Sequence, residues 1–176
     1  MILKTQNLVL RPWVESDAES LYYFAKNPKV GLLAGWPPHQ SVEDSLIIIK
    51  TFFQRPECYA IVKDDIAIGC IDLLIHPSGN HWWGEGCAEI GYWIGEEYWG
   101  RGLVVEACEV LIKRAFEDLN IENIYATYKV ENTQSKRVLE KLGFKYYGEL
   151  DNLDYKNQIF HEIAMVLKNN LNTMKY

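Results

Sequence analysis

The clearest periodic pattern in the chain is an apolar stripe between residues 104 and 119. It consists of Val104, Ala107, Cys108, Leu111, Ile112, Ala115, Phe116 and Leu119. This three- and four-residue spacing places apolar side chains on one face of a helix and therefore predicts an amphipathic helix. Residues 88 to 94 alternate instead, with Ala88, Ile90, Tyr92 and Ile94 facing one way and Glu89, Gly91 and Trp93 the other. That alternation predicts a β-strand just before the helix.

Weaker patterns of the same kinds predict the other elements. Strands are expected at residues 8–13, 59–62, 66–75, 124–130, 146–150 and 159–167. Helices are expected from residue 16, from residue 41 to 53 and at residues 132–142, and the pairs Ser16/Glu19 and Ser41/Asp44 have capping-box spacing. The Gly- and Pro-rich segments 31–40 and 76–86 are expected to be loops. This order of elements predicts an α+β fold with a mainly antiparallel sheet.

The expected helix at residues 132–142 carries polar side chains at regular spacing. Asn132, Ser135 and Leu139 fall on one face, with Val138 and Leu142 on the neighbouring stripe, which we expect to be buried. Asn132 has two interpretations, a ligand contact or simply the N-cap of its helix. Gly143 can adopt the left-handed backbone conformation that ends such a helix.

Length and charge limit the class of protein. The 176 residues predict a single domain, 1–176, with a frayed polar tail at 169–176. The apolar runs are too short to cross a bilayer and the N-terminus lacks a secretion-signal pattern, so no membrane partner is expected. A net charge of -6 disfavours a nucleic acid partner and slightly favours a cationic one, although solubility is the simpler explanation and the one we prefer.

The cysteines and histidines give no sign of a metal site. Cys58, Cys70, Cys87 and Cys108 form no C-x-x-C pair, which is typical of reduced thiols in a cytoplasmic protein. His39, His76 and His81 are scattered on expected loops without the spacing of metal ligands. We therefore expect no metal.

A glycine-rich turn joins the strand at 88–94 to the helix that follows. Gly100 and Gly102 carry no side chains that would block a ligand, and the first N–H groups of a helix have no partners within it. Such a turn can bind a pyrophosphate, with Arg101 adding a charged contact. Alone it is weak evidence, because it could be only a helix start. It matches neither a dinucleotide fingerprint nor a P-loop, since the third glycine and a G-K-[ST] are missing.

Four segments together resemble the GNAT superfamily of acetyltransferases over nearly the whole chain. They are LVLRPWVESDAESLYYF, IAIGCIDL, EIGYWIGEEYWGRGLVVEA and NTQSKRVLEKLGF. The sequence looks most like the branch that includes ribosomal-protein alanine N-acetyltransferases. The resemblance implies a bent, mostly antiparallel central sheet flanked by helices. In that fold a splayed parallel strand pair, here 88–94 and 124–130, would hold coenzyme A.

The same resemblance implies a cytoplasmic N-acetyltransferase that moves acetyl from acetyl-CoA to a primary amine. The acceptor stays open between a protein N-terminal α-amine, a polyamine and another small amine, and a homodimer is left open as well. The implied cofactor-binding residues are Tyr92, Trp93, Ile94, Trp99, Gly100, Arg101, Gly102, Leu103, Val104, Asn132 and Ser135. Glu97 departs from the Gln or Arg that opens the family's pyrophosphate loop, which puts that side chain's contact in doubt.

Acetylation requires the amine to lose a proton, and Glu89 is the candidate general base. It could instead pair with a cation or face solvent, and Glu162, His161 and Glu85 are alternatives. Many relatives use a tyrosine acid where this chain has Leu139. Ser135 is therefore the remaining candidate acid, or it only binds the cofactor.

Loop aromatics are the candidates for the acceptor pocket. Trp36, Trp82 and Trp83 could hold an aliphatic amine or cation through their ring faces, or could form a small hydrophobic cluster or a dimer contact. Two other functions stay open: a non-catalytic module that binds or senses acyl-CoA, and a scaffold without cofactor. The intact glycine turn argues against the scaffold.

Overall fold

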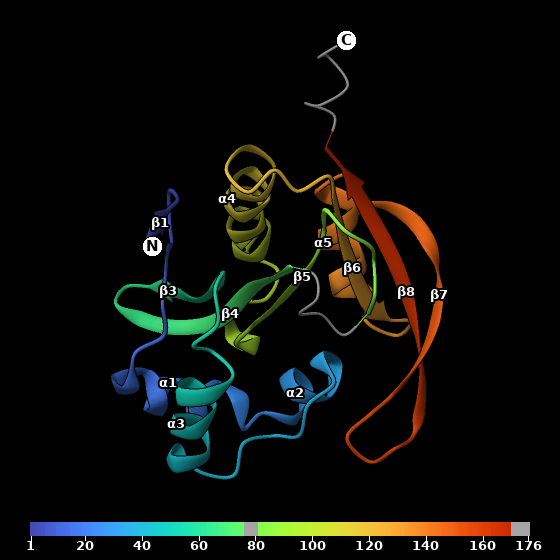
Figure 1. Ribbon diagram of the computed structural model, residues 1–176. Coiled ribbons are helices and arrows are strands. Elements are labelled where there is room, and N and C mark those ends of the chain that lie inside the picture. The colour runs from blue at the N-terminus through green and yellow to red at the C-terminus, as the bar shows by residue number, and fades with distance from the viewer. Residues whose placement is uncertain (76–80, 170–176) are drawn as a thin grey trace.

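The computed structural model describes residues 1–75 and 81–169, and its centre is one eight-stranded sheet with helices on both faces (Figure 1). The strands are β1 (Leu3–Lys4), β2 (Val9–Arg11), β3 (Cys58–Lys63), β4 (Ile66–Ile75), β5 (Cys87–Ile94), β6 (Asn123–Lys129), β7 (Lys145–Leu153) and β8 (Ile159–Lys168). Their order is β1-β2-β3-β4-β5-β6-β8-β7. All neighbours are antiparallel except β5 and β6. The predicted fold class, including the parallel pair, is confirmed.

Helices from the two halves of the chain cover opposite faces of the sheet. They are α1 (Ala18–Ala25), α2 (Pro28–Ala34), α3 (Val42–Thr51), α4 (Leu103–Glu117) and α5 (Thr133–Lys141), with 3-10 turns at Glu15–Asp17 and Glu96–Tyr98. In Figure 1, α1, α2 and α3 lie below the sheet, α4 lies above it and α5 lies beside β6. The helix predicted from the apolar stripe is α4, and the predicted hairpin of β3 and β4 is also present.

The two larger apolar cores of the described residues follow from the alternation of the strands. Ile90, Ile124 and Leu111 belong to the larger core, between the sheet and α4. Leu21 and Ile49 pack with alternate residues of β3 and β4 in a second core, beneath α1 and α3. Burial of apolar side chains on both faces stabilises the sheet from both sides. It also fixes which residues of β5 face α4 and which face the N-terminal helices.

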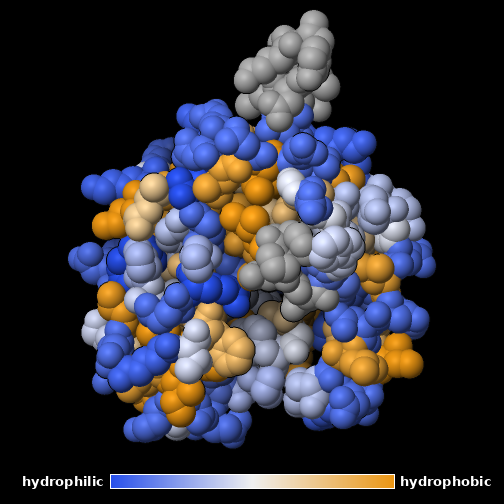
Figure 2. All heavy atoms as spheres, in the orientation of Figure 1, coloured by the Kyte–Doolittle hydropathy of each residue, from blue (hydrophilic) through white to orange (hydrophobic). Residues whose placement is uncertain are grey.

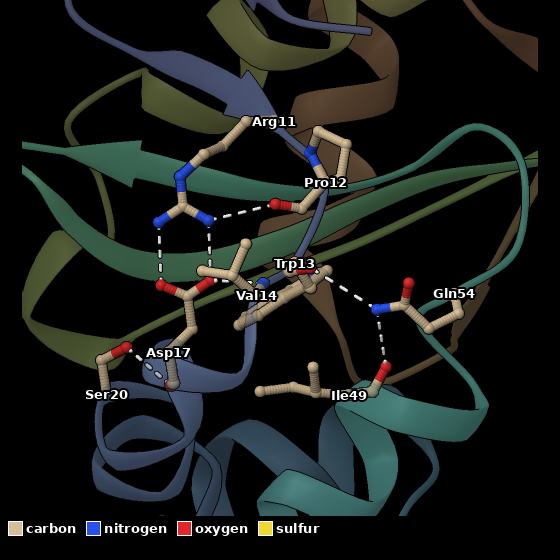
Figure 3. A network of polar contacts seen from close by, with 8 residues as sticks. All are labelled: Arg11, Pro12, Trp13, Val14, Asp17, Ser20, Ile49 and Gln54. Atoms are coloured by element: carbon tan, nitrogen blue, oxygen red, sulfur yellow. Dashed lines mark hydrogen bonds and ion pairs between the residues drawn. The ribbon is translucent and has the colours of Figure 1, made fainter.

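The predicted capping box at Ser16 is wrong. Ser16 lies inside a 3-10 turn, and α1 begins two residues later at Ala18. Asp17 organises this corner instead (Figure 3): its carboxylate accepts two hydrogen bonds from Arg11, at 2.7 and 2.8 Å, and one from the backbone N–H of Val14 at 3.0 Å. A buried carboxylate with these three donors ties the end of β2 to the start of α1.

The segment at 31–40, expected to be a loop, begins as a helix. Its first four residues are the end of α2, whose N-cap is Asn27 with Pro28 in the first helical position. The Asn27 side chain accepts a hydrogen bond from the Lys29 N–H at 3.0 Å, and Gly35 ends the helix with a φ of 87°. The sequence contains the Asn-Pro pair that is typical of a helix start. The segment was expected to be a loop because of its Gly and Pro content.

Helix α5 is rotated relative to the expected orientation. Leu139, which we placed on the polar face, is buried at 1% exposure in the larger core, while Val138 is only half-buried. At the other end of the chain, Asn169 is held by a hydrogen bond from its N–H to the carbonyl of Glu122. The expected fraying therefore does not begin at residue 169, and residues 170–176 lie outside the described residues, as does His76.

Candidate functional site

The two parallel strands at the centre of the sheet separate after three residue pairs. Cys87 pairs with Asn123, Ala88 with Ile124, and Glu89 with Tyr125, and the register ends there. Both strands continue beyond this point, β5 through residues 90–94 to Ile94 and β6 through residues 126–129 to Lys129. The edges of β5 and β6 that face each other beyond Glu89 are therefore open to a ligand, and Glu89 lies at the vertex of the gap.

A cavity of about 1180 Å³ fills this gap. Residues from both faces of the sheet line it: Ile90 and Tyr128 from the face that packs against α4, and Glu89 and Thr127 from the other face. The surface is hollowed near the middle of the view in Figure 2. One ligand can therefore lie along the α4 side while a second approaches the gap from the side of α2 and β8.

The glycine turn forms one end of the cavity. Gly100 and Gly102 both have left-handed backbones, with φ of 73° and 77°, and both line the cavity. A Cβ built on either would meet no atom within 4 Å. Gly102 is the N-cap of the 15-residue helix α4 and supplies no side-chain cap, so the first N–H groups of the helix are available to an anion. The Arg101 guanidinium lies 5.4 Å from the centre of the Tyr98 ring.

Glu89 is buried at 5% exposure. The indole Nε1 of Trp83 donates a hydrogen bond to its Oε2 at 2.9 Å, and His81 Nδ1 lies 3.5 Å from the same oxygen. Among the described residues, Oε1 of Glu89 accepts no hydrogen bond. The carboxylate is therefore fixed through one oxygen, while the other is free to accept a proton.

A second buried carboxylate belongs to the same cluster. Glu162 of β8 is 9% exposed and accepts hydrogen bonds from Thr127 Oγ1 at 3.2 Å and from Asn152 Nδ2 at 3.3 Å. His81 Nε2 lies 3.9 Å from its Oε2, so the imidazole stands between Glu89 and Glu162. The contact with Glu89 raises the pKa of His81, and the charge of Glu162 adds to this, against burial, which lowers it.

A third carboxylate, Asp72 of β4, forms an ion pair with Arg55. Burial raises the pKa of Asp72, and the Arg55 guanidinium opposes that shift. A Cβ on the facing residue, Gly91, would lie 2.7 Å from Asp72 Oδ1. Gly91 is therefore the residue that leaves room for this pair beside the gap.

Asn132 and Ser135 both line the cavity, and their local contacts are structural. The Asn132 side chain accepts a hydrogen bond from the Ser135 N–H at 3.1 Å, which makes Asn132 the N-cap of α5. The Tyr92 hydroxyl donates to the Ser135 carbonyl at 3.4 Å, and burial raises the pKa of Tyr92, so the phenol keeps its proton. The N-cap interpretation is confirmed, and it leaves the Ser135 hydroxyl available to a ligand.

The structure does not gather the three candidate acceptor tryptophans in one pocket. Trp36 lines the cavity and packs against Trp93, with ring centres 5.7 Å apart. Trp83 stacks on Tyr125 at 4.3 Å and holds Glu89, whereas Trp82 is 72% exposed. Of the remaining cofactor candidates, Trp93, Ile94, Trp99, Leu103 and Val104 line the cavity.

Two of the alternative bases lie away from the cavity. The His161 side chain is 73% exposed and contacts Asp151 at 2.5 Å, and Glu85 is exposed. Lys129 had not been identified from the sequence. Its Nζ donates to the carbonyl of Leu32 at 2.7 Å and lies 4.4 Å from the centre of the Phe160 ring, so it bridges the cavity from β6 to α2.

Within residues 1–75 and 81–169, no group of three metal-ligating side chains is close enough to bind an ion. In the same ranges no helix combines the length and the apolar character that a membrane span requires.

Comparison with known proteins identifies related chains. The family described as "Acetyltransferase (GNAT) domain" matches residues 7–145. The uncharacterized N-acetyltransferase YoaA of Bacillus subtilis is 30% identical over 158 residues, which cover 89% of each chain. The ribosomal-protein-serine acetyltransferase of Escherichia coli is 27% identical over 170 residues and 92% of each chain. The spermidine N(1)-acetyltransferase of Escherichia coli is 34% identical over 143 residues, 80% of this chain and 74% of the relative.

Solved structures share the fold. The Mycobacterium smegmatis RimJ in complex with CoA-disulfide superposes with a TM-score of 0.77 at 20% sequence identity. The match covers 99% of this chain and 89% of that one.

Proposed function

This chain belongs to the GNAT family of acetyltransferases and is an acyltransferase, and from that premise we propose that it moves the acetyl group of acetyl-CoA to a primary amine. The observation that carries the proposal is the position of Glu89, a buried carboxylate at the vertex of the gap between β5 and β6. Residues 1–176 would form one catalytic domain.

We propose that acetyl-CoA binds along the α4 face of the cavity. The turn at Gly100 and Gly102 and the first N–H groups of α4 would bind the pyrophosphate, and Arg101 would add a charge. The unpaired edge of β5 beyond Glu89 would lie beside the pantetheine arm. Its backbone N–H groups would stabilise the negative charge that develops on the acetyl oxygen.

Glu89 would accept the proton from the amine through Oε1, directly or through a water. The hydrogen bond from Trp83 holds the opposite oxygen and so fixes the direction of Oε1. Loss of that proton gives the amine the lone pair that forms the new C–N bond while the C–S bond breaks. The departing thiolate is a tolerable leaving group and would take the second proton that the nitrogen gives up as the amide forms. Ser135, on the α5 side of the cavity, would donate a hydrogen bond to the thiolate.

The acceptor is proposed to be a protein N-terminal α-amine, a polyamine or another small amine. The related proteins act on acceptors of two of these kinds, ribosomal protein and spermidine by their names. The carboxylates of Glu89, Glu162 and Asp72 on the acceptor side favour an acceptor with positive charge, and Trp36 offers it an aromatic wall. We also infer a cytoplasmic location, because all four cysteines are buried as free thiols.

The test is thiol release from acetyl-CoA with a panel of amines: ribosomal-protein N-terminal peptides, spermidine, aminoglycosides and free amino acids. Release well above hydrolysis with one class would establish the activity and the kind of acceptor together. If no amine of the panel causes thiol release while acetyl-CoA raises the melting temperature, the alternative of a non-catalytic acyl-CoA-binding module would be favoured.

A further inference from the structure

His81 occupies a position that the proposed reaction does not by itself explain. Its side chain is 17% exposed, and the two ring nitrogens face two different buried carboxylates, Nδ1 toward Glu89 at 3.5 Å and Nε2 toward Glu162 at 3.9 Å. The two carboxylates come from β5 and β8, which are not neighbours in the sheet. One imidazole therefore contacts two acidic groups on strands that lie on either side of β6.

Glu89 and Glu162 are both buried, and one imidazole lies within 4 Å of each of them. In general, a positive charge close to a carboxylate favours its charged form, and a second carboxylate close by disfavours it. Neutral donors reach both groups, Trp83 to Glu89 and Thr127 and Asn152 to Glu162, but none of them supplies a positive charge.

Two other basic side chains near the cavity are engaged with other partners. Arg55 is paired with Asp72, and the Lys129 amine donates to the carbonyl of Leu32 on α2. The titratable and charged groups on the elements around His81 are Asp72 with Arg55 beside β4, Glu89 on β5, Tyr125 and Lys129 on β6, Tyr147 on β7 and Glu162 on β8. Among the described residues, His81 is the one basic side chain with a nitrogen within 4.0 Å of a carboxylate oxygen of Glu89 or Glu162.

We infer that His81 is a positioning residue of the acyl transfer, whose imidazolium between Glu89 and Glu162 keeps both carboxylates ionised so that Glu89 can accept a proton at neutral pH. The inference rests on the proposed function, in which Glu89 is the base. The raised pKa of His81 supports it, because the imidazole then retains its charge toward neutral pH. Glu162 is the partner whose negative charge makes the imidazolium necessary.

The experiment is the pH dependence of kcat at saturating acetyl-CoA with the best acceptor of the panel, because that profile reports the ionisation of groups in the substrate complex. The full-length wild type is compared with His81→Gln, Glu162→Gln and the double variant. The matched control is His161→Gln, since His161 is exposed on the same strand as Glu162 and outside the cavity. The ionisation of the acceptor amine is common to all of them.

We expect His81→Gln to move the midpoint of the acid limb up by about one pH unit or more, with kcat largely recovered at high pH. Adding Glu162→Gln should return the limb toward the wild-type position, because the repulsion is removed together with the cation. Glu162→Gln alone should move the limb to lower pH, because the neighbouring negative charge is removed, and the control should match the wild type.

An unmoved acid limb in a folded His81→Gln variant, verified by its melting temperature, would overturn the inference. Loss of activity at every pH in Glu162→Gln would overturn it as well, since Glu162 would then be the base itself. If the His81 variant does not fold, an acid limb in Glu162→Gln that does not move to lower pH would overturn the inference. Absence of turnover in the wild type would instead count against the proposed function.

Discussion

The indole Nε1 of Trp83 donates a hydrogen bond of 2.9 Å to Oε2 of Glu89. The same indole stacks on Tyr125 with an interplanar angle of 6°, so its orientation is fixed by a strand on the other side of the gap. An adjacent tryptophan, Trp82, is largely exposed. The pair of tryptophans in the sequence therefore divides into one that holds the candidate base and one that faces the surface.

Trp83→Phe should keep the stacking on Tyr125 and remove the hydrogen bond to Glu89. A hydrogen bond to a charged group contributes about 1.5–3 kcal/mol to stability, so we expect the melting temperature to fall by several degrees. Because Glu89 is then no longer held in place, we expect kcat to fall about tenfold or more. Steady-state kinetics with the best acceptor would measure this. Trp82→Phe is the control, and an equal loss of kcat in both variants would contradict the separate role of Trp83.

Glu89→Gln should lower kcat by about 10²- to 10⁴-fold, the range that a general base contributes, because the amide cannot accept the proton. Acetyl-CoA affinity should stay unchanged, since Glu89 lies at the vertex of the gap and not at the glycine turn. Rapid-quench kinetics and calorimetric binding would separate the two effects. Glu149→Gln, at an exposed position of β7, should leave both quantities at wild-type values. An undiminished rate in Glu89→Gln would remove Glu89 from the mechanism.

Gly102→Ala should weaken acetyl-CoA binding. A non-glycine residue at a φ of 77° costs about 1–2 kcal/mol, and relaxation of that strain would shift the N–H groups that start α4. We expect the KM for acetyl-CoA to rise about tenfold, with kcat changed much less. Gly148→Ala is the matched control, because Gly148 has no positive φ and a Cβ there would meet no atom within 4 Å. Equal KM values for the two variants would show that the turn does not bind the cofactor.

The chain offers two serines that look alike in sequence and differ in structure. Ser41 Oγ accepts a hydrogen bond from the Asp44 N–H at 3.1 Å and caps α3, whereas Ser16 is exposed inside a 3-10 turn. Ser41→Ala should lower the free energy of unfolding by about 1 kcal/mol, and Ser16→Ala by less than about 0.5 kcal/mol. Urea denaturation of both would decide, and a similar loss in the two variants would contradict the assignment of the cap.

These elements show what local sequence could and could not predict. The alternation of β5 and the stripe of α4 are properties of adjacent residues, so they predicted which residues face the core and placed Glu89 on the opposite face. The orientation of α5 depends on distant partners, and packing in the core buries Leu139 more deeply than Val138, which we expected on the buried stripe. The cluster of His81, Glu89 and Glu162 joins residues 81 positions apart across a sheet in which β6 and β8 are neighbours. No periodic pattern could indicate that contact.

Another long-range contact joins the second half of the chain to the start of β3. Arg114 of α4 donates two hydrogen bonds to Glu57, at 2.7 and 2.6 Å, and the Tyr59 hydroxyl donates a third to the same carboxylate at 2.8 Å. The hydrogen bonds from Arg114 lower the pKa of Glu57, and that from Tyr59 lowers it further, against burial. The side chains of Glu57 and Arg114 are 10% and 12% exposed, so screening by solvent is limited.

This contact should make stability depend on pH in a defined window. Because the folded-state pKa of Glu57 lies below the ordinary value of 4.5, the folded form binds fewer protons than the unfolded chain in that range. The stabilisation is therefore complete above about pH 4.5 and is lost as the pH falls through the folded-state pKa. Glu57→Gln should lower the free energy of unfolding by about 2–3 kcal/mol at pH 7 and by much less below pH 3. Urea denaturation across pH 3 to 7 would measure the difference between wild type and variant. A difference that stays constant over this range would show that Glu57 acts through packing and not through its charge.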